Sequence, residues 1–169
     1  MAIYKEKCFK NVQALIDATK NDIKSDVLME GVNHYLDMLK SQEAVLRTME
    51  KCKKPSDLQF LVQIAKDNKQ NLFKLGKKDR AVGTHLRCIE DSVNIFVWFM
   101  CSEKADEFKD TFSDFFGAVD FQGEKLTSDG KAENKMWFRA FRTVHQDFFE
   151  FVKGQHPKIM KWTGSSDDA

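Results

Sequence analysis

Proline and glycine are scarce in this chain. Its 169 residues include 2 Pro and 8 Gly, which leaves little of the turn chemistry that joins many short strands. A β-rich fold is therefore not expected. A chain of this length forms one domain, or at most two small ones, and buries roughly 70% of the surface that it exposes when unfolded.

An excess of charge of either sign is also lacking. The formal net charge is +1, and the charged residues, 31% of the chain, are interspersed rather than grouped. Nucleic acids and anionic membranes attract clustered basic residues. Neither is therefore expected as a partner.

No apolar run is long enough to span a bilayer. The longest, Ile95–Cys101, is far shorter than the roughly 20 residues that a spanning helix needs, and the N-terminus has no apolar signal core. A cytosolic protein is expected. The four cysteines contain no Cys-x-x-Cys pair and are interpreted as reduced side chains rather than disulfides or zinc ligands: Cys8, Cys52, Cys88 and Cys101.

Motifs for catalysis are missing as well. The sequence has no Walker loop, no Gly-x-Gly-x-x-Gly and no His-Glu-x-x-His. His85 and Cys88 are spaced like a base and a nucleophile on one helix face, but no Gly-rich loop accompanies them. No Glu-x-x-His repeat supplies a di-metal site either. We expect no enzyme, no cofactor and no metal, and structural roles for scattered histidines such as His34 and His145.

Helical periodicity is what the sequence does have, in six segments. The first covers residues 4–19. In the second, apolar positions alternate steps of four and three residues, which suits packing in an antiparallel bundle. This stripe consists of Leu28, Val32, Tyr35, Leu39, Gln42, Leu46 and Met49.

The middle of the chain gives the start and end signals of further helices. Ser56 and Gln59 have the spacing of a capping box for the third helix, and Ser102 is predicted to cap the fifth. The fourth helix ends in the run Ile95–Cys101, which is predicted to be a buried helix. The polar segment 122–134 contains Gly and is predicted to be a flexible loop.

The last helix lies in the stretch Met136–Trp162. Its apolar residues 137, 141, 144, 148 and 151 follow one helix face, and Phe138 and Phe149 widen that face. A helix so broadly apolar must be buried among several neighbours. Gly154 and Pro157 are expected to end it.

Together these patterns predict an all-α, antiparallel six-helix bundle. The domain is expected to cover residues 1–163, and residues 164–169 are predicted to form a flexible tail.

Three features are candidates for binding a partner. The turn Lys77–Arg80 is either a solvated connection or a cationic ridge for an acidic partner. The tail His156–Trp162 either folds back onto the bundle or forms a partner surface, and packing of Trp162 is favoured. The broad apolar stripe of the second helix serves either the core or a dimer interface, with the core favoured.

Several motifs resemble the N-terminal helical domain of the cyclase-associated protein (CAP) family. Their spacing and order over residues 25–163 carry the resemblance: Cys52-x-x-Pro55, His85-Leu86 followed by Trp98, Trp137-Phe-Arg-Ala-Phe, Phe151-Val152-Lys153, His156 and Trp162. The chain departs from the family pattern at Val97, where the family has Gly, and at Ser102–Asp106, which replaces Pro-Gly-Pro.

The resemblance implies a module that binds actin and cooperates with cofilin in filament depolymerisation and monomer recycling, and that often forms side-by-side homodimers. The resemblance does not include the family's N-terminal coiled coil, which is linked to adenylyl cyclase, so we do not expect the cyclase as a partner. The alternative is a helical scaffold that binds another protein and never touches actin. The candidate contact residues are Lys77, Lys78, Arg80, His85, His156, Lys158, Lys161 and Trp162.

Overall fold

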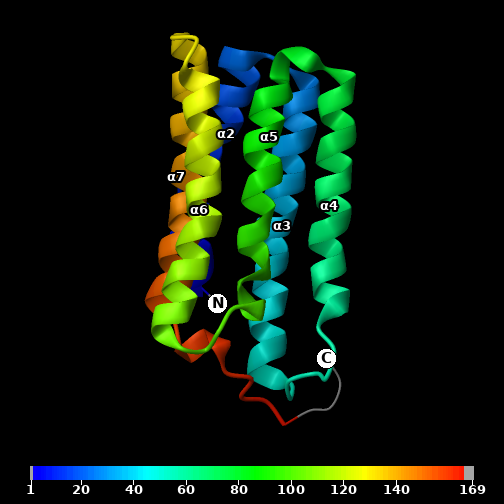
Figure 1. Cartoon of the computed structure of the whole chain (residues 1–169), viewed down its shortest axis with the longest axis vertical. Helices are drawn as coiled ribbons and strands as arrows, with labels where there is room; N and C mark the ends of the chain where they lie inside the picture. The colour runs from blue at the N-terminus through cyan, green and yellow to red at the C-terminus, as the bar shows by residue number, and fades with distance from the viewer. Residues whose placement is uncertain (1, 166–169) are drawn as a thin grey trace.

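Helices account for every regular element in the computed structural model, which describes residues 2–165. The long helices run up and down along one axis (Figure 1). In chain order the elements are α1 (Ala2–Phe9), α2 (Val12–Asp17), η1 (Ala18–Ile23), α3 (Asp26–Lys51), α4 (Gln59–Lys78), η2 (Arg80–Val82), α5 (Gly83–Ser92), η3 (Val93–Met100), α6 (Ala105–Thr127), α7 (Ala132–Gln155) and η4 (Lys158–Met160).

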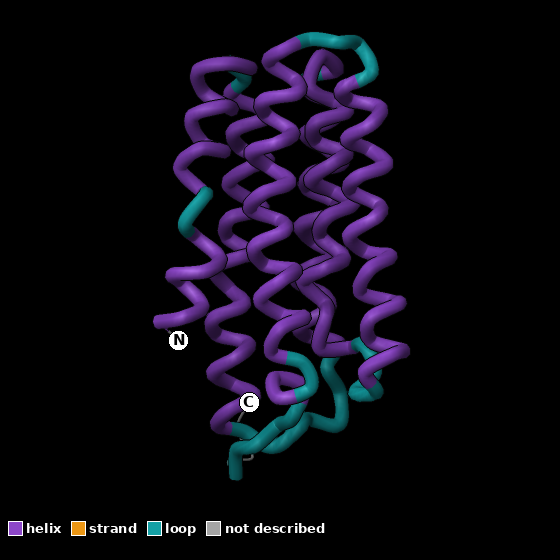
Figure 2. The backbone as a smooth tube through the Cα atoms, turned by 90° about the vertical axis from the view of Figure 1, so that its left-hand side faces the viewer, coloured by secondary structure: helices purple, strands orange, loops and turns teal. Residues whose placement is uncertain are grey.

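The predicted six-helix antiparallel bundle is confirmed. The segments α1, α2 and η1 follow one another as a broken first helix, and α5 continues into η3, so six helical rods form the bundle (Figure 2). No strand occurs within residues 2–165. Residues 166–169 of the predicted tail lie outside the described part of the chain.

The first helix is interrupted, whereas the sequence predicted one continuous helix over residues 4–19. The break falls at Lys10 and Asn11. The Asn11 amide donates a hydrogen bond to the Asp147 carboxylate at 2.6 Å, and the Lys10 ammonium lies 3.1 Å from the same carboxylate. Asn competes with helical backbone bonds, so a tertiary contact with α7 sets the break. The periodicity of this segment could not reveal it.

The predicted stripe of α3 is buried along its whole length, including its polar member Gln42. The Gln42 side-chain oxygen accepts a hydrogen bond from Trp98 Nε1 at 2.9 Å. A buried indole N–H needs such a partner. Gln42 therefore joins α3 to η3, and the apolar breadth of α3 is used by the core.

Both predicted serine caps are wrong. α4 begins at Gln59 after Leu58, and the side chain that accepts the Gln59 N–H is Asp57 rather than Ser56. α6 begins at Ala105, three residues beyond Ser102. The Ser102 hydroxyl accepts the N–H of Lys104, in a turn that precedes the helix.

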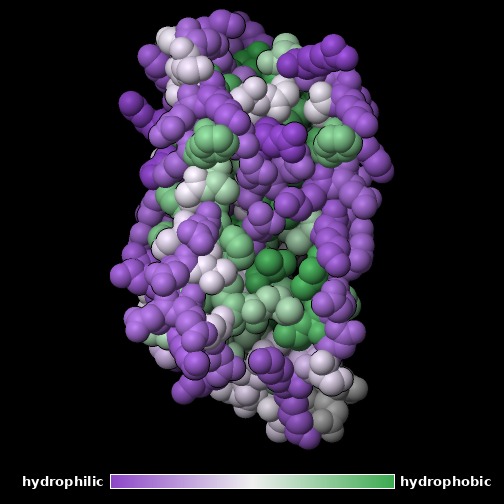
Figure 3. Space-filling view, in the orientation of Figure 1, coloured by the Kyte–Doolittle hydropathy of each residue, from purple (hydrophilic) through white to green (hydrophobic). Residues whose placement is uncertain are grey.

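The run Ile95–Cys101 is helical up to Met100, as predicted, but it winds as a 3₁₀ helix. Val97 departs from helical geometry, with φ −101° and ψ 24°. The run is buried on one side only, because Met100 is 50% exposed and Val97 is partly exposed. Figure 3 shows apolar surface gathered on the lower half of the face that α4, α5 and α6 form.

The segment 122–134 is mostly helix and not the flexible loop that the sequence predicted. α6 continues to Thr127 and α7 begins at Ala132. Gly123 is buried, and a Cβ at this position would collide with the Phe138 ring of α7. This glycine therefore allows two helices to approach closely. Of the two glycines in the segment, Gly130 forms the turn, with φ 75°.

α7 buries the broad apolar face that the sequence predicted, and it ends at Gln155, two residues before Pro157. Trp137 Nε1 donates a hydrogen bond to the hydroxyl of the buried Thr19 at 3.0 Å. His145 is fully buried, and its Nδ1 lies 3.1 Å from the Tyr35 hydroxyl. α7 is thus joined to the first helix and to α3 by polar contacts within an aromatic core.

The close contact between Gly123 and Phe138 predicts that substitution by Ala has opposite effects on stability at Gly123 and at Gly117, both on α6. Gly123→Ala should destabilise the fold, because the new methyl group displaces the Phe138 ring, and such overpacking costs about 1–3 kcal/mol. Gly117→Ala is the matched control, since nothing lies within 4 Å of its Cβ position. Ala is favoured over Gly in a helix by up to about 1 kcal/mol. Urea denaturation measures both, and equal stabilities would contradict the close approach.

Burial of His145 predicts a dependence of stability on pH. Burial lowers the pKa of His145 from 6.5 to about 3. Below pH 6.5 the unfolded chain therefore binds a proton that the folded chain refuses, so stability falls as the pH falls. Between pH 7 and 5.5 this group should cost about 1 kcal/mol.

The variant His145→Gln lacks the titrating ring and should lose less stability over the same pH interval. Urea unfolding at both pH values gives the difference. Parallel pH profiles of the two proteins would show that His145 is not the group responsible.

Candidate protein-interaction sites

The structure offers no catalytic arrangement around His85 and Cys88. Both side chains are buried, and burial raises the pKa of the Cys88 thiol to about 12. A thiol in that state is a poor nucleophile. Within residues 2–165 no group of three or more His, Cys, Asp or Glu side chains is placed to hold a metal ion. No described helix is long and apolar enough to cross a membrane.

The predicted basic turn lies at the upper end of the bundle in Figure 1, where α4 passes into α5. Lys77, Lys78 and Arg80 are exposed. The Lys77 ammonium lies 4.4 Å from the centre of the Phe73 ring. Asp79 shapes the turn, because its carboxylate accepts the N–H of Ala81 at 3.0 Å. Lys78 and Arg80 have no ion pair in the described part of the chain and are available to an acidic partner.

His85 lies beneath this turn and is only 3% exposed. Its Nε2 lies 2.9 Å from the Asn134 side-chain oxygen, and the centres of its ring and the Trp137 ring are 4.9 Å apart in a T-shaped arrangement. Burial lowers the pKa of His85. The side chain therefore ties α5 to the start of α7. Its predicted role as a direct contact for a partner would require it to leave this position.

The predicted tail lies at the opposite end of the bundle (Figure 1). The His156 ring stacks on Phe108 at 4.0 Å, and Met160 is buried. Trp162 is partly buried and packs against the core, as the sequence analysis favoured. The N–H of Thr163 donates a hydrogen bond to the Met49 carbonyl at 3.0 Å. The tail thus closes the lower end of the bundle.

Two lysines of the tail remain on the surface. Lys158 in η4 and Lys161 after it are both exposed. Neither forms an ion pair with another described residue. The predicted contact residues therefore form two sets at opposite ends of the molecule, which one small interface cannot cover.

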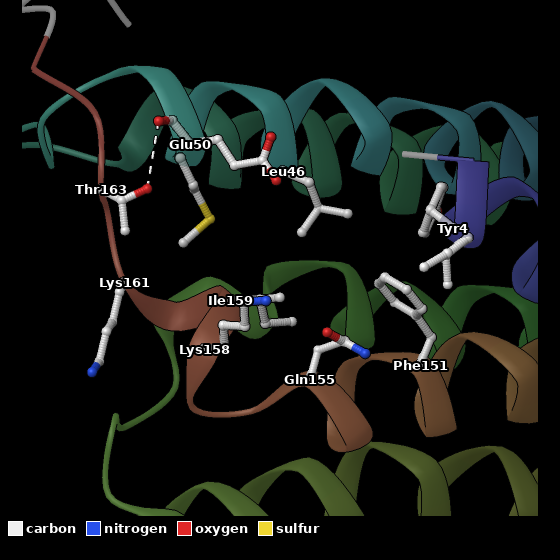
Figure 4. Close-up of a pocket in the computed structure, with 11 residues that line it drawn as sticks. Tyr4, Leu46, Glu50, Phe151, Gln155, Lys158, Ile159, Lys161 and Thr163 are labelled. Atoms are coloured by element: carbon white, nitrogen blue, oxygen red, sulfur yellow. Dashed lines mark hydrogen bonds between the residues drawn. The ribbon is translucent and has the colours of Figure 1, made fainter.

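A groove that the sequence analysis missed opens beside these lysines. It has a volume of about 290 Å³ and lies between α1, the end of α3, the end of α7 and η4. In Figure 4, Leu46 of α3 and Phe151 of α7 approach each other from opposite sides, and the Thr163 hydroxyl bonds to the Glu50 carbonyl at the far end. The lining residues are Ile3, Tyr4, Leu46, Met49, Glu50, Phe151, Gln155, Lys158, Ile159, Lys161 and Thr163.

No local signal in the sequence could have revealed this groove, because its walls come from both termini and from the middle of the chain. Ile3 lay just outside the predicted first segment, residues 4–19, and its exposure of 57% is known only from the structure.

Comparisons with known proteins agree with the fold and with the motifs. A family model described as the CAP N-terminal domain matches residues 4–159. The solved structure of the N-terminal domain of the adenylyl cyclase-associated protein (CAP) from Dictyostelium discoideum is similar over 99% of this chain and 98% of that one, with a TM-score of 0.76 at 12% identity. At that identity the structural likeness concerns the fold. No curated protein sequence matches the chain.

The packing of the tail predicts unequal effects of two neighbouring substitutions. Trp162→Ala should lower the free energy of unfolding by about 1–2 kcal/mol, less than the loss of a fully buried Trp. Lys161→Ala should change it by less than about 0.5 kcal/mol, because the side chain is exposed. Urea denaturation of both variants measures this. A Trp162→Ala protein as stable as the unchanged chain would mean that the tail does not close the core.

Proposed function

Because the chain belongs to the family of CAP N-terminal domains, we propose that it is a regulatory module that binds actin filaments together with cofilin. In this role it promotes the release of subunits and their recycling as monomers in the cytoplasm. The observation that carries the proposal is the family match over residues 4–159. The likeness of fold over 99% of the chain supports it.

The physical form of the molecule suits a binding role. The buried aromatic core holds the six helices in fixed positions, and the turn between α4 and α5 is exposed to solvent. At the turn end, Lys78 and Arg80 are exposed cations without ion pairs among the described residues. An exposed Arg can donate two parallel hydrogen bonds to one carboxylate. We assign the main contact with actin to this end, because Trp162 at the other end is engaged in packing.

A side-by-side homodimer is a second part of the proposal. α3 has no free apolar face for it, since its stripe is buried. The apolar surface over η3, where Met100 is half exposed, is the better candidate. Sedimentation over a range of concentrations tests the oligomeric state.

The turn-end assignment predicts that Arg80→Ala weakens the action on cofilin-decorated filaments. The rate at which filament ends lose subunits is measured with cofilin and increasing amounts of the purified chain. We expect the concentration for half-maximal acceleration to rise about three- to tenfold, and to depend less on salt, because one charge contact is lost. Lys161→Ala should have a smaller effect.

Arg139→Ala is the matched control, because Arg139 is an exposed arginine on α7, a helix that does not form the turn. It should leave the rate unchanged. If the unchanged chain at saturation gives no acceleration beyond cofilin alone, the actin role is excluded. A pulldown that recovers neither actin nor cofilin would then favour a scaffold with another partner.

A further inference from the structure

The groove at the tail end continues the track along which α1 lies. α1 packs against α3 and α7, where the Tyr4 hydroxyl donates a hydrogen bond to the Leu39 carbonyl and the Tyr4 ring meets Phe151 at 5.1 Å. The first turn of α1, with Ile3 and Tyr4, forms one end of the groove. Figure 2 shows this N-terminal helix beginning part-way along the bundle, while neighbouring helices extend beyond its first turn. The groove is therefore a continuation of the surface between α3 and α7 on which α1 packs.

The floor of the groove is apolar, and its side chains from α3 and α7 are themselves largely buried. Leu46 and Met49 come from α3, and Phe151 and Ile159 face them from the other side. Its volume of about 290 Å³ is at the lower limit for ligand pockets, which are roughly 300–1,000 Å³. It suits one or two apolar side chains of a peptide better than a large cofactor. Amphipathic helices that bind in grooves insert a few apolar side chains into such spaces.

The rim of the groove is cationic, whereas the surface that binds α1 is acidic. The ammonium groups of Lys5 and Lys10, on α1 and just after it, lie 3.3 Å from Glu43 and 3.1 Å from Asp147, so the α1 track has acidic edges. Beyond α1 the exposed cations Lys158 and Lys161 line the groove instead.

Figure 4 shows the Lys161 side chain at the outer end of the groove, pointing away from the apolar floor. Glu50 is the one acidic residue among the described lining residues. A segment that continues the track therefore needs carboxylates where α1 has lysines.

We propose that this groove binds an amphipathic acidic helix of a partner protein. Its apolar side chains lie between α3 and α7, and its carboxylates face Lys158 and Lys161. This inference goes beyond the proposed actin function and does not depend on it.

A second copy of this chain is a poor occupant. The apolar stripes of α3, α6 and α7 are buried in the core. α6 and α7 each expose one large apolar side chain, Phe121 and Met136, which is too few for a second apolar face. α4 exposes three, at Phe60, Ile64 and Phe73. However, α4 carries five lysines and one aspartate. Its positive charge would be repelled by Lys158 and Lys161.

Two synthetic peptides of about 14 residues, near the length at which isolated helices become marginal, test the proposal. Both carry leucines on one helical face, and the other positions are glutamate in one peptide and lysine in the other. Methyl NMR spectra of the full chain report binding at Ile3, Leu46 and Ile159. We expect the acidic peptide to shift these signals and to bind at least about threefold more tightly than the basic one, since each exposed ion pair contributes modestly.

The double variant Lys158→Glu, Lys161→Glu should reverse this preference. The double variant Lys66→Glu, Lys135→Glu changes the net charge equally at exposed positions elsewhere and should preserve the preference. Equal binding of the two peptides, or no shift of the three methyl signals at millimolar peptide, would overturn the proposal. The proposal would also be overturned if the chain self-associated and the double variant Lys158→Glu, Lys161→Glu abolished that association. The occupant of the groove would then be a second copy of the chain.

Discussion

Four large aromatic side chains with polar atoms are buried at the centre of this bundle, and each must find a hydrogen-bond partner there. Trp98 bonds to Gln42, Trp137 to Thr19, Tyr4 to the Leu39 carbonyl, and Tyr35 pairs with His145. A buried polar atom without a partner costs about 1–3 kcal/mol. Because every one of these bonds joins different elements, this requirement fixes how the first helix, α3, η3 and α7 lie against one another. Apolar packing alone would tolerate a small shift along a helix, whereas these bonds would break.

Patterns that belong to a single helix could be predicted from the sequence. The stripes of α3 and α7 are long and regular, and both are buried as the periodicity indicated. Features set by contacts between helices could not be predicted. Gly123 suggested a loop, because the residue that needs its missing side chain is Phe138 on the next helix. The break at Asn11 depends on Asp147, which is distant in the sequence.

The same distinction applies to the candidate sites. Exposed cations such as Arg80 and Lys161 could be named from the sequence, since charged residues in turns are usually solvated. The burial of His85 could not, because Asn134 and Trp137 cover it from α7. The groove was also beyond prediction, since Ile3, Leu46 and Ile159 share no local pattern.

The groove exists because two structural requirements meet at the lower end of the bundle. The apolar stripes of α3 and α7 continue past the first turn of α1, so their last apolar side chains need a cover other than α1. The tail then covers part of the exposed end, since Met160 is buried and Thr163 bonds to Met49. What remains between α1 and the tail is apolar at its floor and cationic at its rim. An apolar floor flanked by exposed cations has the chemistry of an interface for an acidic amphipathic segment, whereas the turn end presents exposed cations beside a single exposed aromatic ring, Phe73.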